Sequence, residues 1–121
     1  MEEWFEAADV RGFLHWPEAP TGHGLVLAHG AGSNCRAPLL VGMARALAAA
    51  GFLVLRCDLP FRQQRPKGPP FPAMAARDRE GLRNAAAAIR PMTAGRLYLG
   101  GHSYGGRQAT LLAARISLLR R

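Results

Sequence analysis

A glycine-rich hexapeptide near the end of the chain constrains the fold more than any other feature. It has the sequence Gly-His-Ser-Tyr-Gly-Gly at residues 101–106, after the apolar run 97–99 and before a helix-like stretch at 107–116. Glycine two residues before and two residues after Ser103 indicates a sharp strand-to-helix turn, because a Cβ at either position would collide with the neighbouring strand or helix. The chain should therefore contain an α/β unit built around this turn.

Further apolar runs extend this unit into a layered architecture. Residues 25–28 and 52–55 are continuously apolar, which is typical of strands covered on both faces. Residues 11–16 alternate and end before a proline, as an outer strand would. Helical patterns occupy residues 38–50 and 73–90 between the strands. We therefore predict an α/β fold with a mostly parallel sheet and helices on both faces.

The domain organisation follows from the length and composition. With 121 residues, 49% of them hydrophobic, the chain is expected to form one domain with a buried core. Residues 1–23 would form the outer strand and a turn, and residues 24–121 the core. The start is acidic where a secretory leader would be basic, and Arg45 interrupts the longest apolar stretch, so we expect a cytoplasmic protein with no membrane span.

Neither the cysteines nor the charge indicates a second kind of site. Cys35 and Cys57 are too few and too far apart for a disulfide framework or a paired-cysteine metal site, so we expect ordinary thiols, no metal and no cofactor. The net charge of +8 comes from scattered basic residues, with one dense run at 62–67. No aromatic interleaving accompanies that run, which favours solvated surface charge over nucleic-acid binding. Contact with a phosphate or an acidic substrate is the alternative.

A second glycine loop is predicted to face the first. His29-Gly30-Ala31-Gly32 follows the strand at 25–28 and precedes a helix, so its N–H groups could hold an oxyanion. If the strand at 25–29 lies between those at 52–57 and 97–101, a switch point forms between His29 and Ser103. A simple tight turn would also require these glycines.

Two phosphate-binding loops are disfavoured. Residues 101–106 have the spacing of a phosphate loop, but Arg107 and Gln108 replace the required Lys and Ser/Thr. Cys35 stands where a dinucleotide-binding fingerprint requires its third glycine.

In these segments the sequence resembles the α/β-hydrolase superfamily, and within it the dienelactone-hydrolase-like branch. The resemblance extends from about residue 24 to residue 114. It rests on LVLAHGAG at 25–32, RCDLPF at 56–61 and GGHSYGGRQ at 100–108. A GxSxG motif alone is weak evidence, but its position after a strand, together with the upstream HGAG loop, makes the signal strong.

The resemblance implies roles for residues of both loops. Ser103 would be the nucleophile, and the backbone N–H groups of Ala31 and Tyr104 would form the oxyanion hole. His29 would be structural and brace its loop, and the supporting glycines would be Gly30, Gly32, Gly101 and Gly105. The implied reaction is hydrolysis of an ester or related acyl bond in a small-molecule substrate.

The same resemblance implies an acid and a histidine after the nucleophile. Residues 104–121 contain no His, Asp or Glu, so we expect a partial, C-terminally truncated α/β-hydrolase fold that is inactive or very weak alone. The strand at 97–101 would lie at a sheet edge open to a partner chain or a second copy, and the apolar residues of the tail at 115–121 would lack part of their cover. There are two alternatives. The chain could be a non-catalytic interaction module, as in members of the branch that are subunits of chromatin-modifying complexes, or it could be a truncated remnant of a hydrolase.

The other polar residues are expected to have plainer roles. His102 flanks Ser103 on a strained turn and should not reach its Oγ, so neither His102 nor His29 is expected to be a general base. Asp58 could be a stand-in acid, but a cap for the loop that follows it is the simpler role. His15 and His23 are expected at the surface or in turns.

Overall fold

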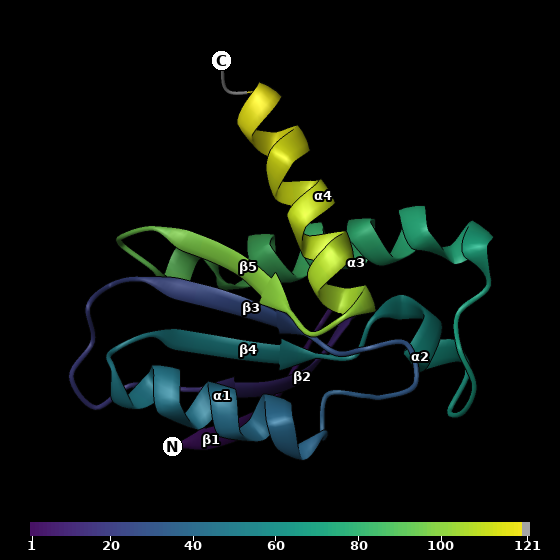
Figure 1. Ribbon diagram of the computed structural model, residues 1–121. Helices are drawn as coiled ribbons and strands as arrows, with labels where there is room; N and C mark the ends of the chain where they lie inside the picture. The colour runs from purple at the N-terminus through teal and green to yellow at the C-terminus, as the bar shows by residue number, and fades with distance from the viewer. Residues whose placement is uncertain (120–121) are drawn as a thin grey trace.

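Five strands of the chain form one mixed sheet in the order β1-β2-β4-β3-β5. This computed structural model describes the backbone of residues 1–119 and the side chains of residues 1–114. β1 (Glu2–Ala7) pairs with β2 (Val10–His15), and β2 with β4 (Leu53–Cys57), both antiparallel. β3 (Gly24–Ala28) lies between β4 and β5 (Leu97–Gly101) and is parallel to both (Figure 1). The predicted central position of the strand at 25–29 is confirmed.

Helices cover both faces of the sheet, as predicted. α1 (Pro38–Ala49) covers one face, and α3 (Ala75–Ile89) and α4 (Tyr104–Leu119) cover the other (Figure 1). A short helix α2 (Pro60–Gln64) follows β4, and 3-10 turns η1 (Pro72–Met74) and η2 (Arg90–Met92) flank α3. α1 ends before Gly51, whose φ of +102° suits glycine, and a proline ends α3.

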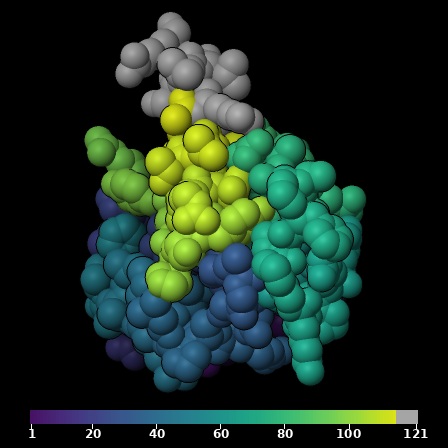
Figure 2. Space-filling view, turned by 45° about the vertical axis from the view of Figure 1, so that its right-hand side comes forward, coloured from purple at the N-terminus to yellow at the C-terminus, as the bar shows by residue number. Residues whose placement is uncertain are grey.

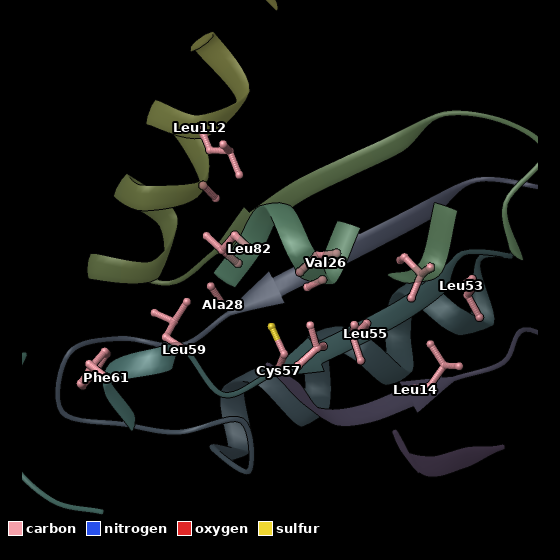
Figure 3. Close-up of a cluster of buried hydrophobic side chains, with 14 residues drawn as sticks. Leu14, Val26, Ala28, Leu53, Leu55, Cys57, Leu59, Phe61, Leu82 and Leu112 are labelled. Atoms are coloured by element: carbon pink, nitrogen blue, oxygen red, sulfur yellow. The ribbon is translucent and has the colours of Figure 1, made fainter. Parts of the chain in front are cut away.

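The alternation of side chains along β3 divides the core into two layers. Leu25 and Leu27 point to the face of α1 and pack with Leu40 and Ala44, whereas Val26 and Ala28 point to the opposite face. That second layer contains Leu55, Leu59, Phe61, Leu82 and Leu112 among its buried members (Figure 3). Both faces of β3 are therefore covered, as its continuously apolar sequence predicts.

Two elements are missing from the sequence-based prediction. β1 adds a strand outside the one predicted at 11–16, and its charged, largely exposed residues show no apolar alternation. Charge of this kind is common on edge strands because it discourages pairing with another chain. α2 lies in the segment that its prolines marked as a loop. The final helix also begins earlier than predicted, at Tyr104, directly after the turn.

The other end of the sheet agrees with the prediction. In the described part of the chain β5 pairs only with β3, so it forms the expected edge. None of the described helices is long and apolar enough to cross a bilayer. The prediction about the apolar side chains at 115–121 lies outside the described side chains.

Candidate active site

The carboxyl ends of the three parallel strands lie in register. Ala28 pairs with Cys57 of β4 on one side and with Gly101 of β5 on the other. The segments that leave the three strands therefore gather at the carboxyl end of the sheet (Figure 1). The carboxyl end of the sheet contains the switch point between His29 and Ser103, where open α/β sheets place their ligands.

The turn after β5 is strained at Ser103 and closely packed at its glycines. Ser103 has a φ of +53°, a left-handed conformation that few non-glycine residues adopt, and its side chain is exposed. A Cβ on Gly101 would lie 2.6 Å from the Ala28 carbonyl oxygen. A Cβ on Gly105 would overlap the His29 carbonyl oxygen and lie 2.7 Å from the Ala28 carbonyl carbon. Side chains are therefore excluded at both glycines, for the steric reason that the sequence suggested.

The loop after β3 is held by the buried ring of His29. Its Nδ1 is 2.8 Å from the Gly30 carbonyl oxygen, and its Nε2 accepts the Leu59 N–H at 3.0 Å. An accepting Nε2 requires the neutral tautomer with hydrogen on Nδ1, which then donates to Gly30. Burial lowers the pKa of His29, in agreement with a neutral ring. The ring ties the loop after β3 to the segment after β4.

The two glycine loops touch each other. A Cβ on Gly30 would lie 3.8 Å from the Ser103 Cβ and 3.4 Å from Nδ1 of His102. In the space-filling view, the yellow-green start of α4 lies against the blue part of the chain that includes the loop after β3 (Figure 2). Within the described residues, the N–H groups of Ala31 and Tyr104 donate to no protein acceptor. Two free backbone donors thus belong to the two loops that meet beside Ser103.

Polar side chains from the segment after β4 stabilise the loop after β3. Arg62 donates to the carbonyl oxygens of Ala31 and Ser33, at 2.9 and 2.6 Å. Asp58 accepts the Cys35 N–H at 2.8 Å. The predicted role of Asp58 as a cap for its own following loop is therefore wrong, since its Oδ1 holds the loop after β3. The prediction that the charges at 62–67 are solvated is wrong for Arg62, since only 5% of this residue is exposed.

A second buried carboxylate supports the turn after β5. Asp78 of α3 is completely buried; its Oδ1 accepts the Phe61 N–H at 3.0 Å and its Oδ2 accepts the Tyr104 hydroxyl at 2.6 Å. Burial raises the pKa of Asp78, although the bonds from Tyr104 and Phe61 oppose that shift. Because Tyr104 follows Ser103, this contact fixes the first residue of α4 beside the turn.

The remaining histidines differ in position. His102 is exposed beside Ser103, and within the described side chains the Ser103 hydroxyl has no hydrogen-bond partner. His23 lies partly exposed, as predicted, and accepts the Arg96 N–H. His15 does not lie at the surface: it is buried, accepts a hydrogen bond from Arg56 at 2.8 Å and lies 3.3 Å from a Glu2 oxygen.

The contacts of Arg62 and Asp78 were missed from the sequence because other basic residues surround them. Arg62 begins the basic run at 62–67, and Asp78 lies between two arginines, so both look like parts of solvated faces. Surface hollows of about 370 Å³ beside Gln63 and about 490 Å³ beside Trp16 have neither Ser103 nor Ala31 in their walls.

Comparisons with known proteins agree with this architecture. A family profile described as an alpha/beta hydrolase domain matches residues 21–119. TT1662 from Thermus thermophilus is 28% identical, with a TM-score of 0.74 over 95% of this chain and 51% of that chain. A dienelactone hydrolase from Anabaena variabilis is 24% identical, with a TM-score of 0.74 over 95% of this chain and 57% of that chain.

A more distant similarity extends to an alpha-beta serine hydrolase homologue from Coxiella burnetii. It is 13% identical, with a TM-score of 0.74 over 93% of this chain and 56% of that chain. The chain therefore spans about half the length of these three structures. No curated protein matches the sequence. The fold expected from the sequence resemblance is confirmed.

Proposed function

This chain belongs to the alpha/beta hydrolase domain family, and on that premise we propose that it carries the nucleophile and oxyanion hole of a serine hydrolase. The observation that carries the proposal is the strained, exposed Ser103 in contact with a loop that offers an unpaired N–H. The substrate class is a small molecule with an ester or related acyl bond. Similarity to the Anabaena protein, a dienelactone hydrolase, supports this class.

The proposed chemistry is attack of the Ser103 Oγ on an acyl carbon. As the carbon becomes tetrahedral, negative charge develops on its oxygen, and the N–H groups of Ala31 and Tyr104 would donate to it. The Tyr104 N–H also lies at the first residue of α4, where the positive end of the helix dipole favours an anion.

The proton of the Ser103 hydroxyl needs a base. Both ring nitrogens of His29 are already engaged with Gly30 and Leu59, which leaves this ring no free nitrogen for the hydroxyl. Residues 104–121 contain no His, Asp or Glu. We therefore propose that none of the described side chains acts as this base. With these residues alone, the expected hydrolysis is very weak.

A thiol at position 103 tests the proposal without that base. The Ser103→Cys variant supplies a nucleophile that ionises by itself, and its acylation by p-nitrophenyl acetate releases nitrophenolate. The matched control is Ala113→Cys, which places an exposed thiol on α4, away from the loops. Cys35 and Cys57 contribute little, because burial raises the pKa of both thiols to about 12.

The two variants are compared per thiolate, from the dependence of the acylation rate on pH. One oxyanion donor is worth about 10²-fold or more in rate, so we expect the thiol at 103 to react at least about 100-fold faster than the control. Equal rates per thiolate would mean that the site does not stabilise the transition state, and the proposal would be abandoned.

The open edge of β5 favours a second candidate function, that of an interaction module. Tyr98 on this strand is 42% exposed, and the outer ladder of β5 has no partner among the described residues. An edge of this kind can take up a strand from another chain. Sedimentation of the chain at increasing concentration tests for a dimer. A sharp monomer boundary at high concentration would count against self-association through this edge.

A further inference from the structure

The loop after β3 contains no regular secondary structure over residues 29–37, yet one guanidinium group joins it to the segment after β4. Arg62 makes four hydrogen bonds, all to backbone carbonyl oxygens. Toward the loop after β3, its Nε donates to Ser33 and its Nη2 to Ala31. Toward the segment after α2, its Nη1 donates to Arg65 and its Nη2 to Gly68. The four distances are 2.6 to 2.9 Å. One side chain therefore fixes two loops against each other.

The burial of this cation is unusual because no acid accompanies it. Among the described residues Arg62 makes no ion pair, and the group lies 4.8 Å from the centre of the Phe61 ring. Removing a charge from water costs several kcal/mol unless other groups compensate for it, and here only carbonyl dipoles and an aromatic ring do so. An apolar side chain would fill the same space without that cost, so the charge and the hydrogen bonds require a reason.

The geometry of the Ala31 peptide gives that reason. The peptide bond is planar, so the direction of the Ala31 N–H is fixed by the Gly30 carbonyl, which accepts hydrogen bonds from His29 and from the Ser33 N–H. The next peptide is fixed by the bond from Arg62 to the Ala31 carbonyl. Ala31 is thus held on both sides, by His29 before it and by Arg62 after it.

We propose that Arg62 is a positioning residue of the oxyanion loop: it holds the peptide that follows Ala31, so that Ala31 is fixed on both sides, and it supplies a positive charge to the loop. The inference rests on the proposed function of Ala31. The charge acts across the loop, since burial lowers the pKa of His29 and the Arg62 cation lowers it further, against opposing effects of Gly30 and Asp58. A loop fixed before the substrate arrives does not have to reorganise during the reaction.

Three variants separate positioning, charge and general effects. Arg62→Gln removes the charge and most of the donors, and Arg62→Lys keeps the charge but loses the planar fork. Arg65→Gln is the matched control, because it removes one charge from the same segment and keeps the backbone carbonyl that Arg62 uses. Circular dichroism and unfolding in urea identify any variant that does not fold, in which case Arg62→Lys carries the test.

The first measurement is amide hydrogen exchange in the full chain. Ser33 and Cys35 donate to Gly30 and Asp58, so their amides are protected and report the order of the loop. We expect Arg62→Gln to speed the exchange of these two amides about 10-fold or more. Arg62→Lys should speed it by a smaller factor, and Arg65→Gln by less than twofold. Unchanged exchange in folded Arg62→Gln or Arg62→Lys would overturn the positioning role.

The second measurement is acylation in the Ser103→Cys background. Arg62→Gln should lower the first-order acylation rate about 10-fold, with little change in the concentration of ester that half-saturates the reaction. Arg62→Lys should recover part of the rate. An unchanged rate, or an effect confined to half-saturation, would overturn the inference.

The two failures are distinguishable. If the thiol at position 103 reacts no faster than the Ala113→Cys control, the proposed function fails, while the exchange rates still decide whether Arg62 orders the loop. If that thiol reacts faster than the control and the Arg62 variants match Arg65→Gln in both measurements, only the role of Arg62 fails.

Discussion

The two glycine loops that meet at this edge of the sheet are held in different ways. The turn after β5 is fixed by its own backbone, which approaches β3 so closely that Gly101 and Gly105 leave no room for a Cβ. The loop after β3 is fixed by side chains, namely its own His29 and, from the segment after β4, Asp58 and Arg62. A Cβ on Gly32 of this loop would meet nothing within 4 Å. The turn after β5 therefore depends mainly on close packing of its backbone against β3, and the loop after β3 mainly on hydrogen bonds from polar side chains.

Replacing one glycine of each loop with alanine should reveal the largest difference between the two loops, in the loss of unfolding free energy. We expect Gly105→Ala to lower the free energy of unfolding by about 3 kcal/mol or more, because its Cβ would overlap the backbone of β3. Gly32→Ala should change it by less than about 0.5 kcal/mol, as is usual for an exposed position. Urea unfolding measures both. Similar losses at the two sites would remove the contrast.

The buried carboxylate beneath the turn after β5 gives the next largest effect. Asp78→Ala leaves the Phe61 N–H and the Tyr104 hydroxyl without their acceptor, which should cost about 2–3 kcal/mol of unfolding free energy. Asp78→Asn keeps one carbonyl oxygen and should cost less. Thermal unfolding of the three proteins measures the order. A loss in Asp78→Asn equal to that in Asp78→Ala would contradict the proposed contacts.

His29, in the loop after β3, should make the free energy of unfolding depend on pH. Burial lowers the pKa of His29 in the folded state below its ordinary value of 6.5. Its contribution to stability is therefore complete above about pH 6.5 and is lost as the pH falls through the folded-state pKa, with a slope of at most about 1.4 kcal/mol per pH unit. His15, whose pKa burial also lowers, adds to the loss. His29→Gln should reduce the slope in urea titrations between pH 7 and 5, and an unchanged slope would exclude His29.

The smallest effect concerns the strain at Ser103. Glycine accepts a φ of +53° without strain, so Ser103→Gly should raise the free energy of unfolding by about 0.5–1 kcal/mol. Ser103→Ala keeps the Cβ and should not stabilise the protein. The comparison uses urea unfolding at pH 7. A loss of stability in Ser103→Gly would mean that the backbone here is not strained.

The sequence is sufficient to predict one loop but only part of the other. Gly101, Ser103 and Gly105 indicate a tight turn because the contacts that require them are made by the backbone of adjacent segments. The positions of the three parallel strands follow for a similar reason, since continuously apolar runs need cover on both faces.

The missed features depend on contacts between residues far apart in the chain. Nothing near Arg62 in the sequence shows that four carbonyl oxygens converge on it. Asp78 lies one residue from arginines and is still buried, because Tyr104 and Phe61 provide its hydrogen bonds. β1 was missed because an edge strand can be stable with charged, exposed residues.

We propose that the N–H groups of Ala31 and Tyr104 both donate to the oxyanion of an adduct formed at position 103. A trifluoromethyl ketone tests it in the Ser103→Cys variant: the thiolate adds to the carbonyl carbon, and the carbonyl electrons move to the oxygen. Backbone NMR spectra of the adduct should show both amide protons shifted downfield together, while Gly32 and Gly106 change little. An adduct that forms at position 103 and leaves the Ala31 and Tyr104 amides unshifted would contradict the account.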